Sequence, residues 1–466
     1  MRTALKTFVV LSFAAALPLA AQDLPADMRA GIDKAAAEVL AKTGAPSASI
    51  AVVRDGKLAY TRAYGNARLD PAMPATSEMR YSIGSISKQF TAAAILLLAE
   101  EGKLSLDDKV VRWLPDLTRA NEVTIRQLLS MTSGYQDFWP QDYVMPNMLL
   151  PVTAQQIADE WAKKPLDFEP GSKWQYSNTN YVLAGMIIEK VSGMPLLDFL
   201  QKRVFGPLQM ATVFNTDLSP LTDRDPERYL RYGGGPAHVA PKEGRGWMFA
   251  AGELAMTPGD LAKWDISMID ETVLKPASYR ELEREILLTT GVGTHYALGL
   301  GVNNVDGRRV LSHGGEVSGF TSRNEVYPEQ RAAVIVFTNL DATDASTQIA
   351  TKIAKVLFAA TDPVTQTALD EMKKIFADLQ HGKIDRSLFT SNANAYFTDA
   401  AVKDFAAALA PLGTPREFTQ SAQSLRGGMT LRRYTIKFPA KTLRLTTFIM
   451  PDGKLEQYQI AAAAEE

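Results

Sequence analysis

The sequence predicts an α/β (α+β) chain in which an antiparallel sheet is flanked by helices, carries a large helical insert and is followed by a small C-terminal α+β domain. Three observations predict this class. Strand-like segments occupy residues 47–65 and return only after residue 307. Helical periodicities and loops rich in Pro, Gly and Asp fill the interval from about 85 to 300. Beyond residue 365, two helical stretches precede a run of alternating strands.

Composition limits the classes of protein that the chain can belong to. Of its 466 residues 46% are hydrophobic, which is enough for a large core and for two domains. The 50 Lys and Arg and the 52 Asp and Glu are dispersed, so nothing indicates a nucleic-acid partner. The absence of cysteine excludes disulfides, thiolate catalysis, cysteine zinc sites and a lipid-anchored lipoprotein cysteine.

The N-terminus has the pattern of an export signal. Arg2 and Lys6 precede an apolar stretch over residues 8–17, and small residues follow in "PLAAQD". We predict a signal peptide over residues 1–21, cleaved after Ala20 or Ala21, and a periplasmic or secreted mature protein. The alternative is a membrane anchor, but the apolar run is too short to span a bilayer, and no other segment is long and apolar enough.

The remaining elements of the first domain follow in order. Residues 27–44 form an amphipathic helical pattern, and residues 47–65 read as two apolar strands joined at Asp55-Gly56, a strong hairpin signal. Three late segments, "RRVLSHGG", "SGFTSRNEVYP" and "AAVIVFTNL", predict an antiparallel run. The helix that follows places four apolar residues on one face: Ile349, Ile353, Val356 and Leu357. We therefore expect the terminal strands and helices to share one sheet, with the helical insert between them.

A linker, "AATDPVTQ", leads to a C-terminal domain over residues 365–466, whose role the sequence leaves open. One predicted helix carries Leu369, Met372, Phe376 and Leu379, and a second covers roughly 398–411. Alternating strands follow at Tyr434, Ile436 and Phe438, at Leu443 and Leu445, and at Leu455, Tyr458 and Ile460. Pro451-Asp452-Gly453 predicts a hairpin turn. The order of these elements resembles that of the cone-shaped folds of the ketosteroid-isomerase type.

A lysine stands at the start of an apolar helix in "YSIGSISKQFTAAAILLLAEEG". From Phe90 to Ala99 nearly every side chain is small or apolar, whereas Lys88 is a cation that opposes the helix dipole and is costly to desolvate. Ser85 lies three positions earlier, on the same helical face. A desolvated lysine with a lowered pKa can take the serine proton, and helix-end amides can stabilise an oxyanion, so the pair suits acyl transfer. The alternative is a capped helix whose lysine extends into water.

Two further motifs follow this pair in order. They are Tyr176-Ser177-Asn178 and His313-Gly314-Gly315, whereas Lys42-Thr43-Gly44 and Tyr64-Gly65-Asn66 precede the serine and are rejected by chain order. The ordered set resembles that of the serine β-lactamase-related hydrolases, which include class C β-lactamases, penicillin-binding DD-carboxypeptidases and family VIII esterases. The likeness covers about 28 to 360. It implies a β-lactamase/transpeptidase-like fold for a domain with those bounds.

The resemblance implies a role for each matching residue. Ser85 is the expected nucleophile and Lys88 its base, and Tyr176, as a phenolate or a hydrogen-bonded relay, shares proton transfer to the leaving group. Asn178 is expected to orient Lys88 and the substrate amide. The backbone amides of Ser85 and Glu316 are the expected oxyanion hole. The structural alternatives are a packed aromatic for Tyr176 and a helix N-cap for Asn178.

His313 departs from the Lys-Thr-Gly form of the third motif. A group that titrates near 6.5 replaces the fixed cation that faces a substrate carboxylate, which puts β-lactamase activity in doubt more than peptidase or esterase activity. The alternative is a strand histidine satisfied by a neighbour. Gly314 and Gly315 suit a strand edge that approaches a substrate closely. The other histidines, His238, His295 and His381, lack metal-ligand spacing, so we expect no metal and no cofactor.

These observations predict an exported serine hydrolase that forms an acyl-enzyme on Ser85. The expected substrates are small molecules or peptides: D-Ala-D-Ala-type peptides, including those of the cell wall, or small esters and amides. One alternative is a β-lactamase. An alternative of another class is a penicillin-recognising or peptidoglycan-binding protein with little turnover, against which the intact Ser85, Lys88 and Tyr176 argue. The oligomeric state is left open.

Overall fold

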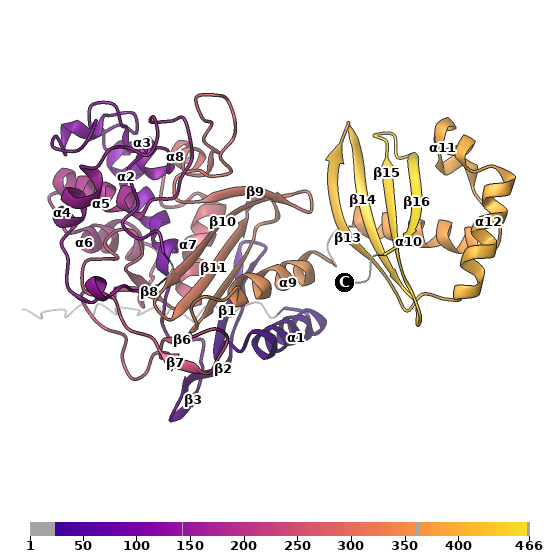
Figure 1. Cartoon of the computed structure of the whole chain (residues 1–466), viewed down its shortest axis with the longest axis horizontal. Helices are drawn as coiled ribbons and strands as arrows, with labels where there is room; N and C mark the ends of the chain where they lie inside the picture. Colours follow the sequence, from indigo (N-terminus) through magenta and orange to yellow (C-terminus); the bar gives the residue numbers. More distant parts are fainter. Residues whose placement is uncertain (1–23, 142, 360–362, 464–466) are drawn as a thin grey trace, which may run out of the picture.

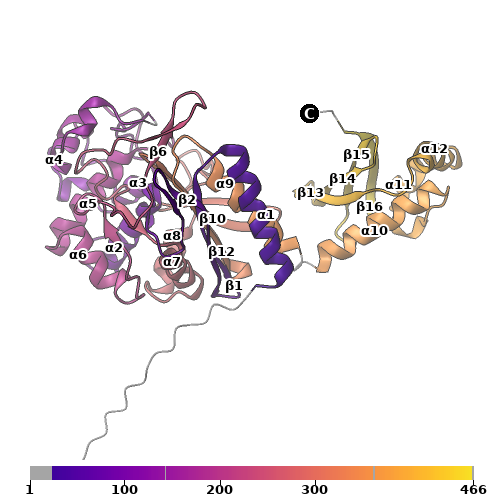
Figure 2. The same cartoon turned by 90° about the horizontal axis from the view of Figure 1, so that it is seen from below.

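A computed structural model describes residues 24–141, 143–359 and 363–463 (Figure 1). The predicted signal peptide, residues 1–21, lies outside the described residues, as does the centre of the predicted linker, residues 360–362. In both Figure 1 and Figure 2 the chain forms a large body, which runs to α9, and a separate smaller body that begins with α10. The predicted class of fold is confirmed.

A seven-stranded antiparallel sheet forms the centre of the large body, with the strand order β3-β2-β1-β12-β11-β10-β9. Its strands are β1 (Ser47–Arg54), β2 (Lys57–Leu69), β3 (Ala72–Pro74), β9 (Gly301–Val305), β10 (Arg308–Val317), β11 (Phe320–Tyr327) and β12 (Ala332–Thr338). The two ends of the domain meet in the middle of the sheet, where β1 pairs with β12 from Ala48↔Thr338 to Val53↔Ala333. The predicted hairpin joins β1 to β2, with Asp55 and Gly56 at positive φ.

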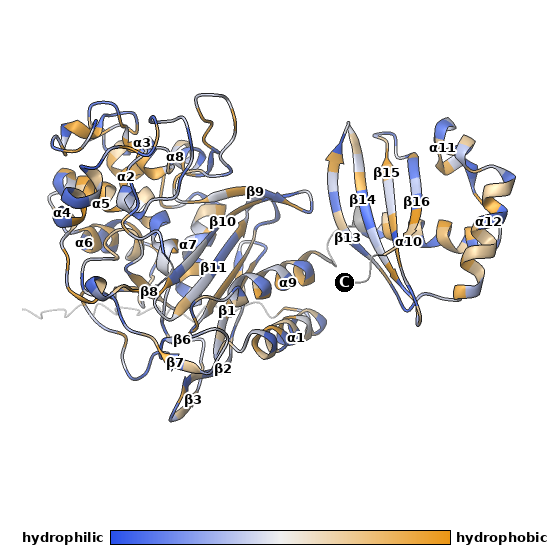
Figure 3. Cartoon of the chain, in the orientation of Figure 1, coloured by the Kyte–Doolittle hydropathy of each residue, from blue (hydrophilic) through white to orange (hydrophobic). Residues whose placement is uncertain are grey.

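Helices cover both faces of this sheet. Alternate residues of β1 and β12 point to opposite sides, and the residues on both sides are apolar, so each face packs against helices. On one face α1 (Ala26–Thr43) and α9 (Ala345–Ala359) pack on Ile50 and Val336, and the predicted apolar face of α9 includes the buried Ile349 and Ile353. On the other face Ala51 and Phe337 belong to a larger core that includes the helical insert. In Figure 3 α1 alternates between hydrophobic and hydrophilic residues, as expected of a helix with one exposed face.

The helical insert lies between β3 and β9. Its helices and turns are η1 (Gly84–Ser87), α2 (Lys88–Glu100), η2 (Val110–Arg112), α3 (Ile125–Leu129), η3 (Pro146–Leu149), α4 (Ala154–Ile157), η4 (Ala158–Ala162), α5 (Asn178–Ser192), α6 (Leu196–Leu200), η5 (Gln201–Phe205), α7 (Pro258–Asp270) and α8 (Pro276–Glu283). The turn η6 (Pro328–Gln330) joins β11 to β12. Helix α2 is buried from Lys88 to Leu98 and forms the axis of the insert.

The insert also contains short strands that the sequence did not predict. They are β4 (Tyr81–Ser82), β5 (Phe214–Asn215), β6 (Tyr229–Arg231), β7 (Ala237–Val239) and β8 (Leu254–Met256). They form a three-stranded sheet in the order β4-β8-β5 and the hairpin β6-β7. Strands of two or three residues are too short to show the alternation on which a strand prediction depends.

A buried polar network connects α2, α7 and β11. The Gln89 side chain accepts a hydrogen bond from Trp264 Nε1 at 2.9 Å and donates one to Asn324 Oδ1 at 3.3 Å. Asn324 Nδ2 in turn donates to Asp265 Oδ2 at 2.7 Å. Asp265 is fully buried, and burial raises its pKa well above the ordinary value, which favours the protonated form of this carboxyl group. Gln89, which interrupts the apolar pattern of α2, is therefore a structural residue.

The C-terminal body has its own apolar core, which includes Met372, Phe376, Tyr434 and Tyr458. Its elements are α10 (Pro363–Gln380), η7 (Arg386–Leu388), α11 (Ser391–Tyr396), α12 (Asp399–Leu409), η8 (Ala410–Leu412), β13 (Glu417–Arg426), β14 (Met429–Lys437), β15 (Thr442–Ile449) and β16 (Leu455–Ala462). The strands form one antiparallel sheet in the order β13-β14-β15-β16. The predicted Pro-Asp-Gly turn joins β15 to β16, and the likeness to cone-shaped folds stays a prediction.

Two elements of this body were missed by the sequence analysis, β13 and α11. Strand β13 is an edge strand with few apolar residues, so its alternation is weak, and α11 is barely longer than one turn. Both are stabilised by their neighbours rather than by a pattern of their own.

Candidate active site

Ser85 lies in the 3₁₀ turn η1, directly before α2. The predicted helix is therefore α-helical only from Lys88 onward. Side chains three residues apart eclipse one another in a 3₁₀ turn, so Ser85 and Lys88 are brought into register. Gly84 has a φ of +52°, and a Cβ at this position would lie 2.9 Å from the backbone nitrogen of Glu316. A glycine is required here because both the backbone conformation and the close approach exclude a side chain.

The Lys88 side chain is fully buried, so the alternative in which it extends into water is wrong. Its Nζ lies 2.8 Å from Ser85 Oγ, 2.9 Å from Asn178 Oδ1 and 2.8 Å from the carbonyl oxygen of Ala251. A neutral amine fits these three neighbours, since it can donate to the two carbonyl oxygens and accept the Ser85 hydroxyl proton with its lone pair. The contact with Ser85 Oγ is the one that the expected role of Lys88 as a base requires.

Burial also favours the neutral form of this amine. It lowers the pKa of Lys88 from 10.5 to about 7, and the negative charge of Asp137 acts in the opposite direction. Thr91 Oγ1, on the same helix, donates to the carbonyl oxygen of Ala250 at 2.7 Å. Helix α2 therefore holds the backbone at the residue before Ala251, whose carbonyl oxygen binds Lys88.

Tyr176 lies two residues before the first residue of α5, and its ring centre lies 5.0 Å from Lys88 Nζ. Burial raises the pKa of Tyr176 above its ordinary value, while the neighbouring Ser85 hydroxyl acts in the opposite direction. The side chain is therefore a neutral phenol at neutral pH. This favours a hydrogen-bonded relay over the phenolate that the sequence analysis also allowed.

Asn178 is the first residue of α5 rather than its N-cap, which is Ser177. Its side chain binds Lys88 through Oδ1 and donates through Nδ2 to Asp137 Oδ2 at 3.3 Å. Its backbone N–H donates to Asp137 Oδ1 at 2.8 Å. The alternative that Asn178 caps its own helix is wrong, because Asp137 receives the backbone N–H at this helix start.

Asp137 is the site residue that sequence analysis missed. It lies between α3 and η3, and burial raises its pKa, while hydrogen bonds from Asn178 and Trp139 and the charge of Lys88 oppose the rise. Only its contact with Asn178, across 41 residues, identifies it. No local pattern could have found it.

The strand β10 carries the third motif past Ser85. A Cβ on Gly315 would lie 1.9 Å from the carbonyl oxygen of Ile83, so this position requires glycine. Ser322 Oγ on β11 donates to the same carbonyl at 2.8 Å. A Cβ on Gly314 would meet only the Ser322 carbonyl oxygen, at 3.7 Å. Of the two glycines, Gly315 is therefore required by packing, and Gly314 leaves space. The backbone nitrogen of Glu316 lies beside Gly84, where an oxyanion partner for the Ser85 amide is expected.

His313 is buried and both of its ring nitrogens have partners. Nε2 lies 2.9 Å from Tyr296 Oη, and Nδ1 lies 2.5 Å from the carbonyl oxygen of Gly314. Since Nδ1–H must donate to that carbonyl, Nε2 accepts from the tyrosine hydroxyl. Burial and the charge of Lys88 lower the pKa of His313 to about 3. The expectation of a group that titrates near 6.5 is therefore wrong, and His313 is a neutral histidine that its neighbours satisfy.

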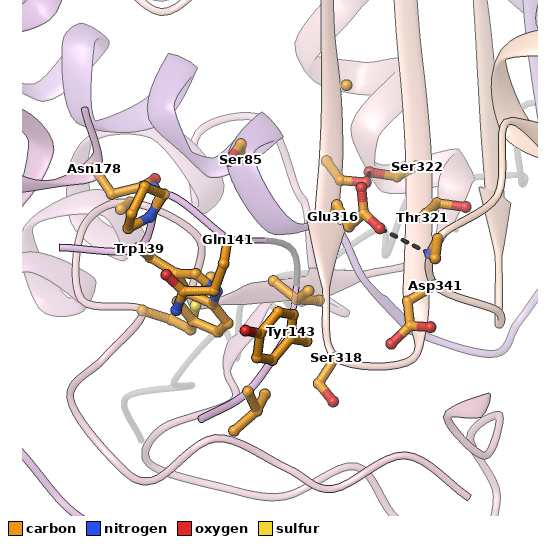
Figure 4. Close-up of a pocket in the computed structure, with 18 of the residues that line it drawn as sticks. Ser85, Trp139, Gln141, Tyr143, Asn178, Glu316, Ser318, Thr321, Ser322 and Asp341 are labelled. Atoms are coloured by element: carbon orange, nitrogen blue, oxygen red, sulfur yellow. Dashed lines mark hydrogen bonds between the residues drawn. The ribbon is translucent and has the colours of Figure 1, made fainter. Parts of the chain in front are cut away.

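The predicted site residues line one cleft of about 1080 Å³, apart from Lys88, which lies behind Ser85. Figure 4 shows Ser85 and Asn178 on one side and Glu316, Thr321 and Ser322 on the facing strands. Aromatic residues form part of the wall: Phe138, Trp139, Tyr143 and Trp247. Hydroxyl-bearing residues form another: Ser318, Thr321, Thr343, Ser346 and Thr347. Within the described ranges, no three His, Asp or Glu side chains are placed to hold a metal ion.

The cleft thus brings together a serine, a buried lysine bonded to it and the phenol of Tyr176. The fold and this site define a serine hydrolase. The chain belongs to the Beta-lactamase family, whose model matches residues 32–358.

Two proteins of similar sequence are consistent with membership of this family. Over 393 residues the chain is 28% identical to Penicillin-binding protein 4* of Bacillus subtilis (strain 168), covering 81% of this chain and 84% of that protein. It is 30% identical to Protein flp of Staphylococcus aureus (strain N315), covering 68% of this chain and 64% of that protein.

Two solved structures extend the comparison. D-amino acid amidase from Ochrobactrum anthropi SV3 superposes with a TM-score of 0.65 at 25% identity, over 72% of this chain and all (100%) of that one. The octameric penicillin-binding protein homologue from Pyrococcus abyssi has a TM-score of 0.64 at 22% identity. It covers 94% of this chain and 96% of that one, and it supports the fold alone.

Proposed function

We propose that this serine hydrolase forms an acyl-enzyme on Ser85 and cleaves amides, D-amino acid peptides or small esters. The observation that carries the proposal is the placement of Lys88 Nζ between Ser85 Oγ and two fixed carbonyl oxygens, which suits a neutral base. The likeness to a D-amino acid amidase supports a substrate with an acyl group of D configuration, and we include D-Ala-D-Ala-type peptides in this class.

The proposed reaction proceeds in two balanced steps. Ser85 Oγ attacks the substrate carbonyl carbon while Lys88 Nζ takes the hydroxyl proton, and the backbone amides of Ser85 and Glu316 hold the oxyanion. The bond to the leaving group breaks as Tyr176 passes a proton to it, and Lys88 restores the tyrosine proton. Water then attacks the ester on Ser85, giving its proton through the same groups, and Ser85 leaves with a proton restored.

The test of this step uses active-site labelling. A fluorophosphonate probe should label the wild type and fail to label Ser85→Ala, with circular dichroism showing that both proteins are folded. The absence of labelling on folded wild type would favour the alternative, a penicillin-recognising or peptidoglycan-binding protein with little turnover. Fast hydrolysis of a chromogenic cephalosporin would favour the β-lactamase alternative, against which the neutral His313 argues.

We also infer that the protein is exported through its N-terminal signal. The pattern over residues 1–21 supports this proposal, and no helix among the described residues has the length and apolar character needed to cross a bilayer. N-terminal sequencing of protein recovered from the periplasm or medium should begin at residue 21 or 22. A sequence that begins at Met1 would contradict export through this signal.

A further inference from the structure

The leaving group of the substrate should lie beside His313, because Tyr176, its proposed proton donor, is next to this histidine. The rings of Tyr176 and His313 are 6.2 Å apart, and those of Tyr296 and His313 are 5.9 Å apart. Trp174 packs on Tyr296 at 5.6 Å. This side of the cleft is therefore an aromatic wall in which the histidine is the group most able to carry charge.

Among the residues that the structure describes, no cationic side chain of this wall lines the cleft. Arg323, whose positive charge acts on His313, is paired with Glu325 at 2.9 Å and donates to Ser312 Oγ at 3.2 Å. His313 is neutral, and its two ring nitrogens are both taken by Tyr296 and the Gly314 carbonyl, so it has no N–H left for a substrate oxygen. The next residue, Gly314, has no side chain and therefore no hydroxyl donor. A Cβ added at Gly314 would lie 3.7 Å from its nearest neighbour, the carbonyl oxygen of Ser322, so a side chain could be accommodated there. Lys88 is held behind Ser85 by its three neighbours.

The rest of the cleft does not compensate for this lack of positive charge. Within the described part of the chain, the cleft is lined by one cationic side chain, Arg231, and by three acidic ones: Asp137, Glu316 and Asp341. Arg231 donates from both terminal nitrogens to the carbonyl oxygens of Thr43 and Gly44, at 3.0 and 2.7 Å. Its charge is thus committed to the end of α1.

We propose that the enzyme acts on substrates whose leaving group is uncharged, such as primary amides, small esters and peptides with a blocked C-terminus, and that it discriminates against a leaving group that ends in a carboxylate. This inference rests on the proposed function. A carboxylate bound beside His313 would give up its hydration without gaining a cation or a free donor, and such an exchange is unfavourable. An amide or ester of the same shape carries no charge, so the loss of its hydration costs much less free energy.

The test compares two probes that differ only in this charge. N-acetyl-D-Ala-D-Ala and its C-terminal amide share the D-Ala-D-Ala peptide bond. Release of D-Ala from the first probe and of D-Ala amide from the second is measured at pH 7.5, separately from any ammonia released from the terminal amide. We expect kcat/KM to be at least about 10-fold higher for the amide, an effect of the size expected when one charged group is left unpaired. Equal or faster cleavage of the carboxylate form would overturn the inference and leave the proposed function standing. If neither probe is cleaved and fluorophosphonate does not label Ser85, both the inference and the proposed function are refuted.

Variants at the same wall provide the second arm. His313→Lys adds a cation, and His313→Gln is the matched neutral control. The ratio of kcat/KM for the amide probe to kcat/KM for the carboxylate probe should decrease in the lysine variant and stay as in the wild type in the glutamine variant. Hydrolysis of p-nitrophenyl acetate shows whether each protein is active. If the lysine variant does not fold, Gly314→Thr places a hydroxyl donor in the available space and should narrow the same preference. A preference that is unchanged in every folded variant would refute the role of this wall.

Discussion

The charge of Lys88 should control the pH dependence of acylation. At pH 7 an amine with a pKa of about 7 is about half neutral, whereas a lysine at its ordinary 10.5 is neutral in roughly one molecule in 3,000, so burial raises the amount of free base by about 1,500-fold. The same difference corresponds to about 5 kcal/mol by which the folded protein disfavours the ammonium form. Below pH 7 acylation should therefore fall about tenfold per pH unit, and above pH 7 it should level off.

The assay is the second-order rate constant of labelling by a fluorophosphonate, measured from pH 5 to pH 9. Asp137→Asn removes a negative charge that raises the pKa of Lys88, so the midpoint of the profile should move to lower pH. His313→Gln is the control, because a histidine with a pKa of about 3 does not titrate in this range. Its midpoint should match that of the wild type.

Three results would refute this reasoning. A labelling rate constant that still rises about tenfold per pH unit up to pH 9 would show that Lys88 keeps the ionisation of an exposed lysine. A midpoint that disappears in His313→Gln would assign the titration to the histidine. A midpoint that is the same in Asp137→Asn as in the wild type would show that the aspartate does not act on Lys88.

Three further predictions concern stability. Gly315→Ala should lower the free energy of unfolding by about 1–3 kcal/mol or more, since its Cβ would overlap the Ile83 carbonyl, whereas Gly314→Ala should stay close to wild type in denaturant unfolding. Equal effects would contradict the packing argument. Asp265→Asn should raise Tm more at pH 8 than at pH 5. Burial raises the pKa of Asp265 in the native state above that of the unfolded chain, so wild-type stability falls as pH rises above the ordinary value of about 4. A gain in Tm that is independent of pH would exclude this cause. A chain that ends at residue 359 should fold and be labelled by fluorophosphonate, because the C-terminal core is separate; loss of folding would show that the two bodies depend on each other.

The sequence could predict those parts of the fold and site that have a local pattern. The central strands show long apolar runs, the Asp55-Gly56 turn has a strong signature, and Ser85 and Lys88 are close in sequence. The order of the motifs was enough to predict that Asn178 and His313 lie in the same cleft as Ser85. Each of these predictions rests on a spacing or a chain order that is visible in one dimension.

The missed features depend on contacts through space. Asp137 meets Asn178 from a loop without a regular pattern, and the Ala251 carbonyl that binds Lys88 belongs to the backbone, where residue type carries no signal. The neutral state of His313 follows from its burial beside Tyr296 and near Lys88. A histidine in a strand pattern is compatible with either charge state until the surrounding residues are known.

The pairing of β1 with β12 has a consequence for how the protein is made. These neighbours at the middle of the sheet come from opposite ends of the domain, since Ala48 pairs with Thr338. While the ribosome is still adding the residues between them, β1 has only its hairpin partner β2, and an isolated hairpin is marginally stable. The nascent chain must remain open until nearly the whole hydrolase domain has been synthesised, as such non-local pairing is slow to form. An open chain is also the form that can be threaded through a narrow translocation channel.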